Sequence, residues 1–175
     1  MGGFAGQLVS AVLWLSSAAV STWASHRLGM IVLFLGGFLI YPLTQLVNRL
    51  MGRAGKLRDG NALNGLATQV AFPLPLNQPL VLGATLYREE WFYPAFMVAL
   101  GAHYLPFVFL YGMRQFAVLT AVLVGGGVLL AMYGPDIFAL GGWLTAAVLL
   151  VFALLGRSVA LREESATAQA ATPAR

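Results

Sequence analysis

One histidine and one proline stand close together inside an apolar run. His103 lies in the string Gly-Ala-His-Tyr-Leu-Pro, about 12 residues after Trp91. On a transmembrane helix this places the imidazole roughly 18 Å from Trp91, near the bilayer centre, where an ionisable group is costly and therefore a functional candidate. Pro106 has no N–H to give to the carbonyl of Ala102, so we expect an unpaired acceptor beside His103 and Tyr104. The alternative is a neutral histidine that ties two helices together by one hydrogen bond.

Three prolines interrupt another apolar run: Pro73, Pro75 and Pro79. Each proline lacks a backbone donor and clashes with the preceding turn, so the run cannot form one regular helix. We expect two half-helices joined by an extended segment, with Asn77 or Gln78 capping the second half and Pro79 in its first turn. Two interpretations stay open. The break forms a polar binding site, or it is a kink whose freed carbonyls are satisfied by Gln69, Asn64 or a neighbouring helix.

Two carboxylates precede the run that contains His103. Glu89 and Glu90 stand directly before Trp91. Glu89 is roughly 21 Å from His103 along a helix, so an acid–base couple between them would need water or another helix. Solvated carboxylates at a helix start are the simpler interpretation. The candidate substrate-binding residues are therefore Asn77, Gln78, His103, Tyr104, Glu89 and Glu90.

The remaining reactive side chains are few. The chain has no cysteine and only two histidines, which leaves no thiolate site and no recognisable metal motif. A lone histidine makes no hydrolytic set unless Ser16 or Ser17 lies within hydrogen-bond reach of it. We therefore expect no metal, no cofactor and no enzymatic activity. The basic residues are scattered between apolar blocks, which argues against nucleic acid as a partner.

The composition indicates whether the chain folds in water or in a lipid bilayer. Hydrophobic residues make up 59% of the 175 residues and charged residues 9%, against about 25% charged residues in soluble domains. A bilayer tolerates such a surface, because hydrocarbon favours apolar side chains that face outward. The sequence predicts an all-α, polytopic transmembrane helix bundle.

A span needs roughly 20 apolar residues, and six blocks come near that length. They cover residues 4–24, 28–46, 63–87, 91–112, 116–132 and 137–155, and the third is the block that the prolines break. The first block has no basic residue before it and exceeds the apolar length of a signal peptide, so we expect a retained span. Residues 1–156 form the membrane domain, and the polar residues 157–175 are predicted to be a disordered cytoplasmic tail.

The basic residues test the number of spans. With the amino terminus inside, six spans place eight Lys and Arg residues on the inner side and two, Arg27 and Arg88, on the outer side. Five spans would divide them equally, five and five. The positive-inside rule therefore favours six spans with both termini cytoplasmic.

Part of the chain resembles a known family. The run from Phe72 to Pro79, the string Gly-Ala-His-Tyr-Leu-Pro and the aromatic run from Phe107 to Tyr111 are similar to small bacterial multi-pass membrane proteins, catalogued as domain of unknown function 7010. The resemblance implies a bacterial inner-membrane location and no particular activity.

Three functions remain open at this point. A small-solute or ion transporter or channel would use the broken third span and His103 as its site, and predicts a continuous polar cavity from one face to the midplane. A structural or partner-binding membrane protein would use the same polar groups to hold helices together. An intramembrane enzyme comes third. The lipid bilayer is the expected partner in every case, a small solute or ion in the first, and assembly into a homo-oligomer is left open.

Overall fold

The computed structural model describes residues 3–50, 69–70 and 72–170, and every regular element among them is helical. The helices are α1 (Gly3–Trp23), α2 (His26–Leu50), α4 (Pro73–Leu76), α5 (Gln78–Tyr87), the 3₁₀ turn η1 (Glu89–Trp91), α6 (Phe92–Tyr104), α7 (Phe107–Tyr111), α8 (Gln115–Tyr133) and α9 (Leu140–Ala170). The predicted all-α class is thus confirmed.

Five of these stretches are long and apolar enough to cross a membrane: Phe4–Trp23, His26–Leu50, Glu89–Leu110, Gln115–Tyr133 and Leu140–Ser158. They correspond to five of the six predicted blocks. The third block differs, because its described part forms the short helices α4 and α5, and residues 63–68 and 71 lie outside the described residues. The last helix continues beyond the predicted span, as far as Ala170. The disordered tail stays a prediction.

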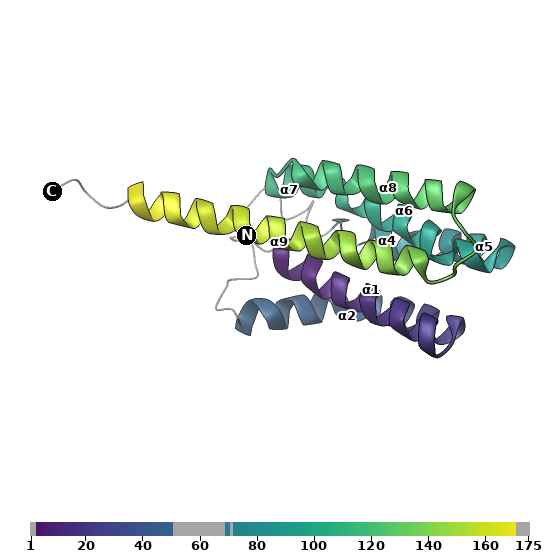
Figure 1. The fold of residues 1–175 in the computed structure, drawn as a ribbon. Helices are drawn as coiled ribbons and strands as arrows, with labels where there is room; N and C mark the ends of the chain where they lie inside the picture. The colour runs from purple at the N-terminus through teal and green to yellow at the C-terminus, as the bar shows by residue number, and fades with distance from the viewer. Residues whose placement is uncertain (1–2, 51–68, 71, 171–175) are drawn as a thin grey trace.

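The long helices run side by side, with α1 packed against both α2 and α9, and α6 packed against α8 (Figure 1). Glycines permit the closest approaches. A Cβ atom at Gly127 of α8 would lie 2.7 Å from the carbonyl oxygen of Pro94 in α6, and one at Gly36 of α2 would overlap Leu13 of α1. Small residues at these crossings let the backbones approach.

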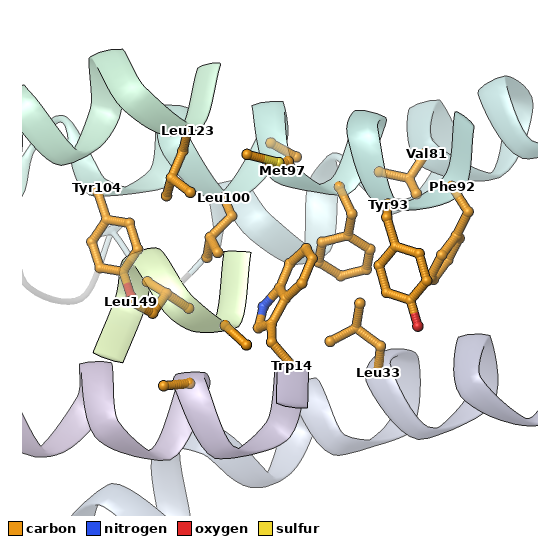
Figure 2. Packing of buried hydrophobic residues seen from close by; sticks show 14 of the residues in the cluster. Trp14, Leu33, Val81, Phe92, Tyr93, Met97, Leu100, Tyr104, Leu123 and Leu149 are labelled. Carbon is orange, nitrogen blue, oxygen red and sulfur yellow. The ribbon is translucent and has the colours of Figure 1, made fainter. Parts of the chain in front are cut away.

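Aromatic side chains fill the space between the α1–α2 pair and α6. Trp14 of α1 packs edge-on against Phe96, with ring centroids 5.4 Å apart, and also contacts Tyr93. Leu33 of α2 points into the same cluster, and Leu100, Leu123 and Leu149 continue it toward the other end (Figure 2). The interior of the bundle is therefore packed with apolar side chains along most of its length.

The two ends of the bundle differ in their residues. Trp23, Trp91 and Trp143 lie at one end, called here the Trp end, where α1 meets α2 and α8 meets α9. The opposite end, where α1 begins and α8 begins, is called the Gln end after Gln7 and Gln115 (Figure 1). The outer surface is apolar, as on α2, where Leu35, Phe38 and Leu39 are exposed. Lipid is the solvent that suits such a surface.

Candidate functional site

The proline break is built from two short helices with one residue between them. A proline occupies the first turn of α4 and of α5, where a missing N–H costs nothing and the fixed φ suits the helix. Asn77, between them, has helical angles of φ −82° and ψ −7°. The extended segment expected here is therefore wrong, whereas the place of Pro79 in the first turn of α5 is confirmed. Proline at a first turn starts a helix as readily as it ends one, so the break is a kink.

The two amides at the break bond to the turn that precedes them. Nδ2 of Asn77 donates to the carbonyl of Pro73 over 2.8 Å, and Nε2 of Gln78 donates to the carbonyl of Leu74 over 3.3 Å. Neither side chain caps α5, so the predicted cap is wrong. Both carbonyls also accept the backbone N–H of Asn77, and among the described residues neither is bonded to Gln69 or a neighbouring helix, so the alternative of freed carbonyls stays a prediction. Asn64 lies outside the described residues.

A groove of about 300 Å³ lies between the break and α6. Its lining is apolar except for one amide, and comprises Asn77, Leu80, Val81, Ala95, Val98, Ala99 and Ala102. The volume is that of a small ligand site, but such sites carry several convergent polar groups and this groove has one. It resembles a slot for hydrocarbon more than a polar pocket.

The turn that follows His103 contains one backbone hydrogen bond that the sequence did not predict. Helix α6 ends at Tyr104, and the N–H of Leu105 donates to the carbonyl of Ala102 over 3.2 Å. The unpaired acceptor expected at Ala102 is therefore wrong, because the chain tightens into a turn before Pro106. Thr120 of α8 donates its hydroxyl to the neighbouring carbonyl of Gly101 over 2.9 Å.

The imidazole of His103 packs among rings. It lies 5.2 Å from Phe107 and 5.8 Å from Tyr104, centroid to centroid, and its Nδ1 is buried without a hydrogen-bond partner. His103 is not one of the residues that line the groove, although its neighbour Ala102 is. The alternative for His103 was a hydrogen bond that ties two helices together, and Nδ1 makes no such bond.

The predicted carboxylates lie at the Trp end. Glu89 accepts a contact from Nδ1 of His26 at 3.2 Å, and His26 stacks on Phe138 with centroids 4.0 Å apart. Arg88 pairs with Asp136 at 3.0 Å and lies 3.9 Å from Glu90. Three loops are thus joined by exposed ion pairs. Glu89 thus connects the start of α2 to η1, whereas Glu90 contacts Arg88 in its own turn, and among the described residues neither forms a hydrogen bond or ion pair with Asn77 or His103.

The structure contains a buried cluster of hydroxyl groups that was not predicted from the sequence. The hydroxyl of Tyr93, a residue with 0% exposure, lies 2.7 Å from Oγ of Ser17 and 2.8 Å from Oγ of Ser21. Ser17 donates to the carbonyl of Gly29 over 2.7 Å. Since that proton is committed, Tyr93 must donate to Ser17 and Ser21 to Tyr93, and the chain joins α1, α2 and α6 (Figure 2 shows Tyr93 directed toward α1 and α2). The polar residues Gln7, Ser10, Ser17 and Ser21, spaced for one helix face, were the available signal.

Gln7 and Thr44, at the Gln end, are the opposite case. Gln7 is only 2% exposed, and both atoms of its amide are buried without a hydrogen-bond partner. Oγ1 of Thr44 in α2 is likewise unpaired. A Cβ atom at Gly156 would lie 3.7 Å from Oε1 of Gln7 and 3.2 Å from Nε2 of Gln115, so these two amides lie close together. A buried amide without partners is costly. The surroundings of Gln7 are therefore the second candidate region for a functional site.

The other sites considered from the sequence have ordinary explanations in the described residues. Ser16 donates to the carbonyl of Val12, and Ser17 belongs to the Tyr93 cluster, so neither is hydrogen-bonded to His103. No three His, Asp or Glu side chains come together as a metal site in the part of the chain that the structure describes.

One family model matches residues 1–158, which is most of the chain; its description is a family of unknown function, DUF7010. The chain belongs to the DUF7010 family. The match extends the resemblance found around the proline break and His103 to all five long helices. No curated protein and no solved structure matches the chain. The description of the DUF7010 family names no activity.

Proposed function

We propose that this protein is a non-conducting membrane protein that acts by binding a partner within the bilayer, with its polar groups spent on holding the helices together. The observation that carries the proposal is the use of Asn77 and Gln78. Both amides donate to backbone carbonyls of the preceding turn, which also accept the backbone N–H of Asn77. One N–H of each amide is engaged in this way, which holds the side chain against its own turn.

The hydroxyl cluster supports the same function. The hydroxyls of Ser21, Tyr93 and Ser17 form a chain of hydrogen bonds that ends at the carbonyl of Gly29 in α2. Hydrogen bonds between helices stabilise membrane bundles by about 1 kcal/mol each. The groove beside Asn77 is apolar apart from that amide, which suits a hydrocarbon partner rather than an ion.

The topology belongs to the proposal as well. We propose six spans with both termini in the cytoplasm, the third formed by the kinked segment that contains α4 and α5. Basic residues support this orientation, since Arg49, Arg114 and Arg157 mark the Gln end. Reporter fusions at the amino terminus and after Arg175 should report the same side of the inner membrane of a bacterial host. Opposite sides would establish an odd number of spans.

Transport of a small solute or ion is the second candidate, and one observation favours it. The unpaired atoms of Gln7, Thr44 and His103 all belong to the half of the bundle nearer the Gln end, whereas the hydroxyls and ion pairs toward the Trp end have partners. A solute that enters from the Gln end would meet these groups. An enzymatic role has no such support, because His103 is hydrogen-bonded to neither Ser16 nor Ser17.

Solute flux in proteoliposomes separates the two candidates. Purified protein would be tested with Na⁺, K⁺, Cl⁻, protons, urea and glycerol, against empty liposomes and against His103→Ala and Gln7→Leu. The proposal expects fluxes equal to those of empty liposomes for every probe. Flux of any probe in wild type that falls in either variant, but not in a control with the exposed Gln69→Leu, would establish transport instead.

A further inference from the structure

A small polar pocket lies at the Trp end of the bundle, where the start of α6 and the end of α8 meet the start of α9. Its volume is about 60 Å³, which is room for a few groups the size of a water molecule. A Cβ atom at Gly141 would lie 2.8 Å from Cβ of Tyr93 and 3.4 Å from Cδ of Pro94. Glycine there lets α9 pack closely against α6, so two walls of the pocket are fixed by helix packing.

Three charged side chains line the pocket: Arg88, Glu90 and Asp136. Nη2 of Arg88 donates to Asp136 over 3.0 Å, and Nε of Arg88 lies 3.9 Å from the Glu90 carboxylate. Each of the three side chains is between 43% and 78% exposed, so molecules outside the bundle can reach them. Two carboxylates share one guanidinium, and the pocket therefore keeps one net negative charge.

The end of α8 adds a backbone acceptor to this pocket. Pro135 stands four residues after Ala131, at the position whose N–H would otherwise bond to the carbonyl of Ala131, and proline has no N–H. Both residues line the pocket. A donor that enters would thus meet two carboxylates and the last turn of α8.

A primary ammonium is the group that suits these acceptors. It carries three N–H donors and one positive charge, whereas a trimethylammonium has no N–H to donate. Hydrogen bonds between an ammonium and carboxylates are charge-assisted and therefore among the stronger ones. The guanidinium of Arg88 has five N–H groups and its bond to Asp136 uses Nη2, so donors remain for a phosphate oxygen.

The place of the pocket decides which ammonium compound reaches it. Trp91 lines the pocket, and tryptophan is enriched at the level of lipid headgroups. Met132 and Ile137, which also line it, are 65% and 59% exposed, so an apolar rim adjoins the charged side chains. An amphiphile fits this arrangement, with its headgroup at the charges and its apolar part along the rim.

We propose that this pocket binds the headgroup of one phosphatidylethanolamine molecule. The ammonium lies between Glu90 and Asp136, and the phosphate contacts the free N–H groups of Arg88. This lipid site is distinct from the groove beside Asn77, and the inference stands whether or not the protein conducts a solute.

Native mass spectrometry of the full-length protein tests the site. The protein in detergent would be titrated with phosphatidylethanolamine, phosphatidylcholine and phosphatidylglycerol that carry identical acyl chains. The bound fraction of the first bound lipid should be several-fold higher for phosphatidylethanolamine than for the other two. Equal binding of phosphatidylethanolamine and phosphatidylcholine would overturn the proposal, because the two headgroups differ only in the N–H donors.

Glu90→Gln and Asp136→Asn remove one carboxylate each at constant size, and each should reduce that excess. The matched control is Glu89→Gln, because Glu89 is similarly exposed in the same turn but is not one of the residues that line the pocket. An excess that survives both substitutions, or that Glu89→Gln reduces equally, would contradict the site. Free ethanolamine at the concentration of the lipid should not displace it, since the soluble amine lacks the phosphate and the apolar part. Displacement would overturn the lipid as the occupant in favour of any small amine.

Discussion

The side-chain amide of Asn77 donates to the carbonyl of Pro73, four residues earlier, over 2.8 Å. The same carbonyl also accepts the backbone N–H of Asn77 over 3.0 Å, so the side-chain amide is its second donor. In hydrocarbon no water can pair with a side-chain amide, so the bond gives Asn77 a partner within its own turn. Asn77, a candidate ligand from the sequence, thus has one N–H bonded within its own turn.

Replacing Asn77 should therefore affect stability. Asn77→Ala removes the second donor to the Pro73 carbonyl and should lower the free energy of unfolding by about 1 kcal/mol, because one intramolecular hydrogen bond is lost. Gln78→Ala, whose bond is longer, should cost less. Unfolding by SDS titration in mixed micelles measures both. Equal stability of Asn77→Ala and wild type would show that the bond does not support the kink.

Tyr93→Phe should lower the free energy of unfolding by about 1–2 kcal/mol, since the ring stays packed while Ser21 loses its acceptor and Ser17 its donor. Ser16→Ala is the matched control, because its hydroxyl bonds only within its own helix. A double-mutant cycle of Tyr93→Phe with Ser21→Ala should show coupling between the two changes. Additive losses would mean that the two hydroxyls act independently.

Gly29→Ala should destabilise the α1–α2 pair by about 1–3 kcal/mol, as overpacking of a tight contact does. The added Cβ atom would overlap the Ser21 side chain and lie 2.8 Å from the carbonyl oxygen of Ser17. Gly37→Ala in the same helix is the control, because nothing lies within 4 Å of its Cβ position. There the better helix propensity of alanine should be neutral or stabilising. A loss of the same size in both variants would contradict the close-approach argument.

Gln7→Met should stabilise the protein by about 1 kcal/mol, because it replaces an unpaired buried amide with an apolar side chain of similar length. Thermal unfolding in detergent measures the change, with the exposed Gln69→Met as the control. A marked loss of stability would mean that the amide has a partner in the membrane, and would favour the transport candidate.

Helix length and composition could be predicted from the sequence because hydropathy depends on counts of residues. Five blocks became five long helices for that reason. The geometry of the break could not be predicted in the same way. A proline excludes the helix interior but suits a first turn, so Pro73 and Pro79 each start a helix instead of leaving an extended gap.

The candidate site was predicted only in part, for a related reason. Asparagine can bond either to a ligand or to a carbonyl four residues back, and its position in the sequence is the same in both cases. Tyr93 looked like an interfacial aromatic residue beside Trp91, and only the fold brings it to Ser17, 76 residues away. Long-range partners of this kind depend on how the helices pack, which periodicity does not specify.

Water access to the break and to His103 tests the central claim most directly. The chain has no cysteine, so single cysteines at Ala102→Cys and His103→Cys can be probed in vesicles with a membrane-impermeant thiol reagent, with the exposed Asp136→Cys as the positive control. In a dry interior the thiolate does not form, so both positions should react roughly 100-fold more slowly than Asp136→Cys. Both should still react with an apolar maleimide after transfer to detergent. Reaction of His103→Cys and Ala102→Cys at the rate of the control would reveal a water-filled path and contradict a non-conducting bundle.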